Sequence, residues 1–195
     1  MRKLVYYVAV TLDGYIAGPG GEYDFYPRGE AAQAAEYTAW MNARYPETVP
    51  TFLRADHGLT DVPNARFDTV LMGLGTYRPA LDAGFPSPYA HLRQYVVSST
   101  LAAAPAPGVT VVADDPLGLV RDLKRAAGGD IWLCGGGRLA GALLPEIDEL
   151  VLKSYPVVAG AGVPVIAGEF GPTPFRVSDR TSFANEVTVT WFTRR

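Results

Sequence analysis

The sequence predicts an α/β fold, a three-layer sandwich with a mostly parallel central sheet and an antiparallel hairpin at its C-terminal end. Three observations carry this prediction. Apolar runs of strand length alternate with helical patterns, two glycine-rich turns each join such a run to a helix, and two alternating segments close the chain. Alternating strands and helices are typical of a parallel sheet covered on both faces.

Length and composition limit the alternatives. We expect one domain over residues 1–195, since a chain of that length buries a substantial core. The net charge is −3 and no run is rich in lysine or arginine, which argues against a nucleic-acid partner. No apolar run approaches the ~18 residues of a membrane span. We therefore expect a cytoplasmic protein without a membrane partner.

The first third of the chain contains a strand, a helix and a long irregular segment. Residues 4–12 form the expected strand, because the run is rich in Val and Tyr. Residues 18–21 form a Gly/Pro loop. Residues 30–44 are rich in Ala, and one face of the segment is more apolar than the other, which predicts a helix. Residues 45–66 contain three prolines and little periodicity, so we interpret them as a loop insertion that covers a site or a subunit contact.

The remaining elements follow from short apolar runs and helical spacing. Strands are expected over residues 67–72, 94–98, 109–113, 130–134 and 149–154, and a hairpin over 175–182 and 186–194. Helices are expected from the glycines at 73–75 to about residue 81, over 117–127, and over 138–144. The helix over 117–127 ends at a pair of glycines, and the one over 138–144 ends at a proline.

Two strand–turn–helix sites are glycine-rich: Gly73-Leu74-Gly75-Thr76, and Gly135-Gly136-Gly137. In a parallel sheet both turns open at the carboxyl ends of strands, where ligands of such sheets bind. Free N–H groups at the following helices attract phosphate, so the two turns together would hold the two phosphates of a dinucleotide. The alternative is that these glycines only make tight turns and that Thr76 only caps a helix.

Other chemical signals are weaker. Ser98 and Ser99 follow a strand and either contact a ribose phosphate or only form a loop. The two histidines, His57 and His91, are isolated, and Cys134 has no nearby ligand partner, so no metal site is expected. A protein without a metal or nucleophile set can still be a reductase, because a nicotinamide supplies the hydride.

Taken together, these motifs resemble the dihydrofolate reductase-like superfamily. The closer branch contains the reductase domain of bifunctional riboflavin-biosynthesis deaminase–reductases and stand-alone bacterial proteins. Five segments carry the resemblance, in the same order and over nearly the whole chain: residues 8–17 (VAVTLDGYIA), 72–77 (MGLGTY), 96–99 (VVSS), 133–137 (LCGGG) and 156–164 (PVVAGAGVP).

The resemblance implies a sheet of about eight strands, a homodimer, and NADPH across the carboxyl ends of the strands. It also implies a site for each part of the cofactor. Ala9, Ile16 and Ala17 would line the nicotinamide pocket; Gly73, Gly75 and Thr76 would cradle one phosphate; Ser98 and Ser99 would face the adenosine; Gly135, Gly136, Gly137 and Arg138 would hold the pyrophosphate. Arg138 is equally compatible with a solvent-exposed helix position.

One position departs from the family. An arginine usually follows the first glycine of the Gly-x-x-Thr motif, where it pairs with the 2′-phosphate that distinguishes NADP from NAD. Here that position is Leu74, so NADH is an alternative cofactor to NADPH. Loss of a charge-assisted contact lowers affinity by roughly 1.5–3 kcal/mol. Arg78 or Arg93 is a candidate to replace it.

The proton donor is open at this stage. The family's folate reduction uses a carboxylate near the first helix. Asp24 is our first choice and Asp13 our second, since a carboxylate in an apolar cleft has a raised pKa. Asp13 followed by Gly14 is also typical of a turn. The aromatic residues 23, 25 and 26, with Trp40, would stack on a flat heterocycle or belong to the core.

The sequence thus predicts an NAD(P)H-dependent oxidoreductase that passes a hydride to a small heterocyclic or carbonyl/imine substrate. A non-catalytic protein that binds a nucleotide or small ligand on the same fold is the alternative. A third hypothesis is an interaction protein that dimerises through the 45–66 insertion and apolar edge strands.

Overall fold

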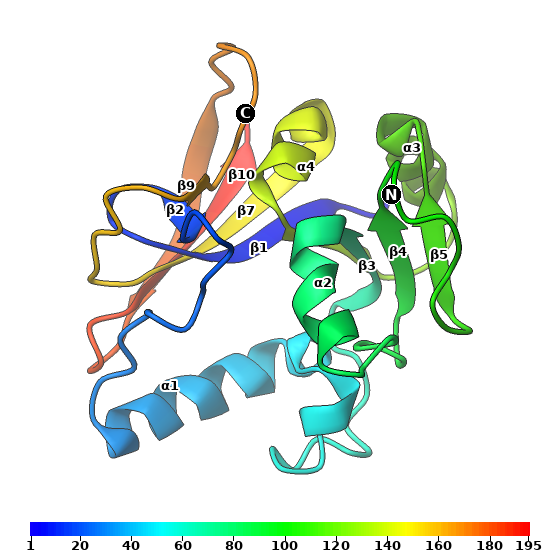
Figure 1. The fold of residues 1–195 in the computed structure, drawn as a ribbon. Coiled ribbons are helices and arrows are strands. Elements are labelled where there is room, and N and C mark those ends of the chain that lie inside the picture. The colour runs from blue at the N-terminus through cyan, green and yellow to red at the C-terminus, as the bar shows by residue number, and fades with distance from the viewer.

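The structure is a computed structural model that describes residues 1–195, and its centre is an eight-stranded sheet in the order β5-β4-β3-β6-β1-β7-β10-β9 (Figure 1). Six neighbouring strands run parallel: β1 (Leu4–Val10), β3 (Phe67–Gly73), β4 (Arg93–Val97), β5 (Val109–Val112), β6 (Asp130–Gly135) and β7 (Ile147–Ser154). The hairpin of β9 (Phe175–Ser182) and β10 (Thr188–Arg194) adds to β7 antiparallel. The predicted fold class is confirmed.

Helices cover both faces of the sheet and give the three layers. On one face, α1 (Ala31–Arg44) and α2 (Leu74–Asp82) place Met41 and Tyr77 in a core with Trp132. On the other face, α3 (Pro116–Arg125) and α4 (Gly137–Ala142) contribute Val120 and Leu139 to a second core. Figure 1 shows α1 and α4 on opposite sides of β1. We call the first face the α1 face.

The position of strand β1 in the sheet explains why its sequence is continuously apolar. It lies between β6 and β7, and residues 4–8 are buried on both faces. Strands with both faces covered lack the alternation of a half-exposed strand. Burial of each large apolar side chain there contributes roughly 1.5–3 kcal/mol to folding. Strand β1 is therefore held firmly in the sheet, and its carboxyl end borders the site.

The 45–66 segment is irregular, as predicted, with two short 3₁₀ helices, η1 (Pro46–Thr48) and η2 (Thr51–Leu53). It is fixed by a fully buried carboxylate. The Glu47 carboxylate accepts N–H bonds from Ala65, Arg66 and Phe67 at 3.0, 2.9 and 2.7 Å. A buried charge is tolerated only when it is paired in this way. The segment is therefore attached to the start of β3.

A second, two-stranded sheet was not predicted. It pairs β2 (Tyr15–Ala17) with β8 (Val163–Pro164) antiparallel. A third 3₁₀ helix, η3 (Leu144–Glu146), joins α4 to β7. None of the four α-helices has the length and apolar character needed to span a membrane.

Candidate functional site

The two glycine-rich turns lie side by side at the carboxyl edge of the sheet. Gly73 ends β3 and is the N-cap of α2, and Gly136 is the N-cap of α4. A Cβ built on Gly73 would lie 3.4 Å from the backbone N of Gly136. No side chain caps either helix. The uncapped first turns of the two helices therefore begin close together, and their N–H groups have no side-chain acceptor.

Thr76 and Ile16 complete this arrangement. A Cβ on Gly135 would lie 3.1 Å from the Thr76 hydroxyl, and one on Gly136 would lie 3.5 Å from the same oxygen and 4.0 Å from Ile16 Cδ1. Gly135 has φ +143°, a conformation that favours glycine, and the Gly135–Gly136 peptide bond is cis. Hence Ile16 and both turns, the first of which includes Thr76, meet although they come from three separate parts of the chain.

Gly137 and Gly75 differ in their surroundings. A Cβ on Gly137 would lie 1.9 Å from the Pro164 carbonyl oxygen, so this glycine lets β8 pack against α4. A Cβ on Gly75 would meet nothing within 4 Å. Ala17, which pairs with Val163 in β8, lies on the same small sheet. Gly137 is thus explained by packing, whereas Gly75 faces open space.

The cations near the turns are few. Leu74 is partly buried and packs against the α1-face core, whereas Arg78 is exposed one turn further along α2. Arg93 begins β4, at the opposite edge of the sheet, and pairs with Asp68 at 2.7 Å. Arg93 therefore cannot replace the family's arginine. Arg138 is exposed in the first turn of α4 and forms no ion pair.

The two serines after β4 have different roles. Ser98 is buried, and its hydroxyl accepts N–H bonds from Thr100 and Leu101 at 3.2 and 3.0 Å. Ser98 therefore closes the turn after the strand. Ser99 is exposed and makes no side-chain hydrogen bond. Of the two, only Ser99 has an exposed hydroxyl without a partner in the protein.

The carboxylates that the sequence suggested as acids do not have an acid's surroundings. The Asp13 carboxylate accepts the Thr11 hydroxyl at 2.6 Å and the N–H groups of Ala159 and Gly160 at 3.0 and 2.7 Å. These bonds, led by the Thr11 hydroxyl, lower the pKa of Asp13 to about 2. Asp24 is exposed on the surface loop before α1. Asp13 therefore fixes a loop, and neither carboxylate lies in an apolar cleft.

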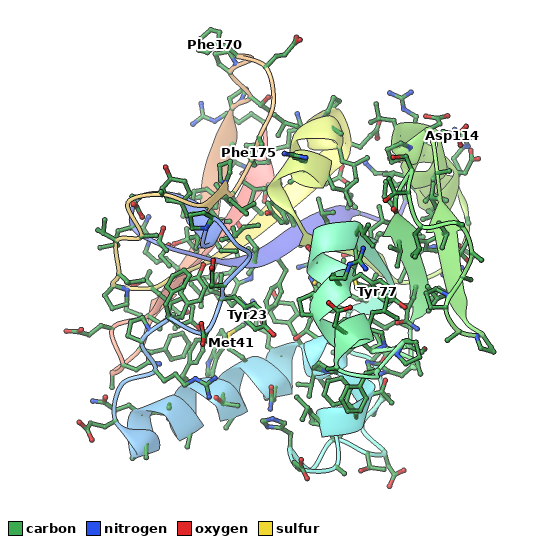
Figure 2. The ribbon with its side chains drawn as sticks, viewed as in Figure 1. Tyr23, Met41, Tyr77, Asp114, Phe170 and Phe175 are labelled. Carbon is green, nitrogen blue, oxygen red and sulfur yellow. The ribbon has the colours of Figure 1, made fainter.

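The aromatic residues before α1 separate into two groups. Phe25 stacks on Tyr26 at 4.6 Å between ring centroids, and Tyr26 lies 4.8 Å from Tyr155. The Tyr26 hydroxyl donates to the carbonyl oxygen of Ala9 or of Tyr15, at 3.3 and 3.2 Å. Tyr23 is 62% exposed, and Figure 2 shows it over the region between α1 and α2. Phe25, Tyr26 and Tyr155 thus form an aromatic cluster beside the end of β1.

Trp40 does not belong to this aromatic cluster. Its ring lies 5.1 Å from Phe183 and 5.9 Å from Trp191, within the core between α1 and β10. Trp40 thus follows the alternative interpretation, in which the aromatic residue is part of the core.

Sequence reasoning missed Lys153, which lies at the end of β7 on the α1 face. It pairs in register with Ala9 of β1, and its Nζ lies 4.2 Å from the centroid of the Tyr7 ring. Burial lowers the pKa of its ammonium. A lysine directly after the apolar run Leu150–Leu152 of an inner strand is the signal that would have found it.

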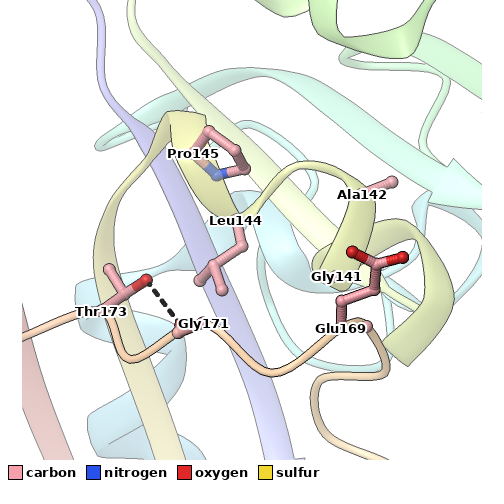
Figure 3. A pocket seen from close by; sticks show the side chains of 8 residues that line it. Gly141, Ala142, Leu144, Pro145, Glu169, Gly171 and Thr173 are labelled. Carbon is pink, nitrogen blue, oxygen red and sulfur yellow. Dashed lines mark hydrogen bonds between the residues drawn. The ribbon is translucent and has the colours of Figure 1, made fainter.

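Two cavities lie near these elements. One, of about 670 Å³, lies along α1 and is lined by Tyr37, Tyr155, Arg28 and His57 among others. The other, of about 550 Å³, lies between α4 and residues 168–173, where Figure 3 shows Glu169 as its one charged side chain. Only the first shares a residue, Tyr155, with the aromatic cluster. No group of His, Cys, Asp and Glu side chains is arranged to hold a metal ion.

Comparison with known proteins identifies the family. The model of the RibD C-terminal domain matches residues 2–189. The chain belongs to the RibD C-terminal domain family. This confirms the resemblance that the five sequence motifs indicated.

Relatives of this RibD C-terminal domain protein are found among curated sequences. It is 28% identical over 188 residues to the uncharacterized protein YwjB of Bacillus subtilis (strain 168), with 95% of each chain covered. It is 30% identical over 179 residues to the uncharacterized protein YyaP of the same organism, with 84% of this chain and 80% of YyaP covered.

Solved structures share the fold. A putative riboflavin biosynthesis protein from Shewanella sp. PV-4 matches with a TM-score of 0.68 and 25% identity, over 100% of this chain and 99% of that one. A diaminohydroxyphosphoribosylaminopyrimidine deaminase/5-amino-6-(5-phosphoribosylamino)uracil reductase from Thermotoga maritima matches with a TM-score of 0.63 and 15% identity, over 100% of this chain and 57% of that one. The second likeness shows the fold alone.

Proposed function

We propose that this RibD C-terminal domain protein is an NAD(P)H-dependent reductase of a small heterocyclic or carbonyl/imine substrate. One observation carries the proposal: two uncapped helix N-termini, at Gly73 and Gly136, meet at the carboxyl edge of a parallel sheet, near a cluster of aromatic rings. Membership of a family of reductase domains supports the same assignment.

The residues present fit a nicotinamide dinucleotide. The space over Gly75, which a side chain would occupy, suits a phosphate next to the N–H groups of α2. Thr76 would donate its hydroxyl, Arg138 and Ser99 would contact the more distant phosphate and adenosine, and Ile16, Ala17 and Ala9 would border the nicotinamide. When bound, the cofactor supplies a hydride.

The chain's own contribution is to orient the substrate and exclude water. The rings of Phe25, Tyr26 and Tyr155 form a wall against which a flat heterocycle would pack, because aromatic rings favour offset stacking at 4.5–7 Å. The cavity along α1 would receive the substituents of that ring. Arg28 and His57 at its border suit an anionic or hydrogen-bonding group.

We propose NADPH as the cofactor, with Arg78 as the cation for the 2′-phosphate in place of Leu74. Titration of the protein with NADPH and separately with NADH, followed by quenching of tryptophan fluorescence, tests this. Saturable binding with preference for NADPH is expected. Absence of binding to both would overturn the reductase assignment, and binding without turnover of any carbonyl or imine would favour the non-catalytic alternative.

We also propose a homodimer that uses the outer edge of the sheet. Strand β9 is an edge strand, and its Val177 is 52% exposed. Exposed sheet edges invite pairing with another chain. Light scattering after size exclusion is expected to give twice the mass of 20.9 kDa, and a monomer mass would contradict this assignment.

A further inference from the structure

Lys153 is the one lysine without a carboxylate partner. The chain has three lysines. Lys3 pairs with Glu149 at 2.6 Å, and Lys124 pairs with Asp148 at 2.8 Å and Glu146 at 3.4 Å. Lys153 forms no ion pair, although its position on an inner strand removes much of its water. An ammonium in such a place is costly unless it serves a ligand.

The position of Lys153 is set by the sheet. It pairs with Ala9 of β1 on one side and with Val189 of β10 on the other. Val151, two residues earlier on the same strand, belongs to the α1-face core, so Lys153 points to that face. Its Nζ lies over the Tyr7 ring. The ammonium thus lies at the carboxyl edge of the sheet, beside the strand that would border the nicotinamide.

The titratable groups around Lys153 are phenols and a thiol. Tyr7 of β1, Cys134 of β6 and Tyr155 after β7 are the titratable groups nearest to it. Tyr155 extends this set to Tyr37 of α1, with 3.4 Å between the hydroxyl oxygens, and to Tyr26 of the preceding loop.

Cys134, Tyr26, Tyr7 and Tyr37 keep their protons at neutral pH. Burial raises the pKa of the Cys134 thiol and of the Tyr26 phenol to about 12, and it raises those of Tyr7 and Tyr37 as well. No carboxylate faces the ammonium from any of these elements. Among them, Lys153 is the group that carries a proton it can release.

We propose that Lys153 is the proton donor of the reduction and that the substrate is a planar carbonyl or imine compound without a positive charge. This inference rests on the proposed reductase function. As hydride adds to the substrate carbon, the C=O or C=N π bond breaks, and the oxygen or nitrogen takes a proton from the Lys153 ammonium. The resulting neutral amine regains its proton from water. A cationic substrate would be repelled by the same ammonium.

Competitive acetylation measures the pKa and the accessibility of the Lys153 ammonium without any substrate. The protein and a short unstructured peptide with one lysine are pulsed together with acetic anhydride at pH 6–11, and the acetylation of each lysine is measured by mass spectrometry. Lys153 is expected to react, with a half-maximal pH below that of the peptide lysine. An unreactive Lys153, or one that titrates with or above the peptide, would overturn the proposal.

Two variants of Lys153 test whether its ammonium takes part in the reaction, with K3M as the matched control. K153M and K153R are expected to bind NADPH within twofold of the wild type. With 9,10-phenanthrenequinone as a planar dicarbonyl probe, K153M is expected to lower kcat about 100-fold, a typical size for general acid catalysis. The wild-type rate should fall as pH rises through the pKa of Lys153, and K153R should lose this fall.

The outcomes separate the two proposals. No binding of NADPH to the wild type would defeat the proposed function. NADPH binding with unchanged kcat in K153M would defeat the role of Lys153 alone. If the wild type does not reduce the quinone, the acetylation result decides. A reactive Lys153 with a pKa below that of the peptide lysine supports the proposal. A Lys153 that does not react, or that titrates like the peptide lysine, overturns it.

Discussion

The two glycine turns that meet at the carboxyl edge look alike in sequence but differ in what their glycines do. In the turn after β6, Gly135 has φ +143°, and Gly137 contacts the Pro164 carbonyl so closely that a Cβ would lie 1.9 Å from it. In the turn after β3, Gly75 has an ordinary backbone and open space in place of a side chain. The first turn is required by the fold, whereas the second is free for a ligand.

This difference separates two reasons for a glycine that a sequence pattern cannot distinguish. A glycine that holds two backbones together contributes to stability, and its substitution is expected to unfold the protein. A glycine over open space contributes nothing to packing, so its substitution should alter only what binds there. The proposed cofactor site therefore depends most on the turn after β3.

The largest expected effect is that of G137A. A methyl group at this position overlaps the Pro164 carbonyl, which forces β8 away from α4. We expect a loss of about 3 kcal/mol or more in the free energy of unfolding. Urea denaturation followed by circular dichroism measures it, and a loss below about 0.5 kcal/mol would show that the turn is not fixed by this contact.

The next effect is on cofactor affinity. G75D puts a carboxylate where the phosphate is proposed to lie, and it should also favour the start of α2. We expect Kd for NADPH to rise at least tenfold with no loss of stability. G171D is the matched control, because a Cβ on Gly171 also meets nothing within 4 Å and lies far from the turn in sequence. Equal affinities of the two variants would contradict the site.

A smaller effect distinguishes the cofactors. R78A removes the exposed cation that we assign to the 2′-phosphate, and exposed ion pairs contribute up to about 1 kcal/mol. We expect roughly a threefold rise in Kd for NADPH and none for NADH, measured by fluorescence titration at low salt. A parallel change for both cofactors would place Arg78 elsewhere.

The smallest effect is a gain. G75A introduces a better helix former at an unstrained, uncrowded position, which should raise the free energy of unfolding by about 0.5–1 kcal/mol. The same denaturation experiment measures it. Destabilisation would mean that Gly75 is needed by the fold and that the contrast between the two turns is invalid.

The sequence predicted the fold well because its elements carry local signals. Apolar runs marked β1 and β6, and a glycine after each of two strands marked the turns that meet. It could not reveal β2 and β8, which are too short for periodicity. Glu47 becomes a buried anchor only through N–H groups at Ala65, Arg66 and Phe67.

The candidate site was less predictable for a related reason. Asp13 looked like an acid or a turn residue, and its loop partners lie about 146 positions along the chain. Lys153 had no motif, since its surroundings come from β1, β6 and the loop before α1. Which side chain meets which across distant segments is set by register and packing, not by neighbouring residues.

The most direct test of the central claim is an amide ¹H–¹⁵N spectrum of the protein recorded with and without NADPH. We expect the largest shifts on the backbone amides of Gly75, Thr76, Gly135 and Gly136, with smaller ones at Ile16. Shifts confined to other surfaces, such as the cavity lined by Gly141 and Glu169, or no shifts at saturating NADPH, would contradict it.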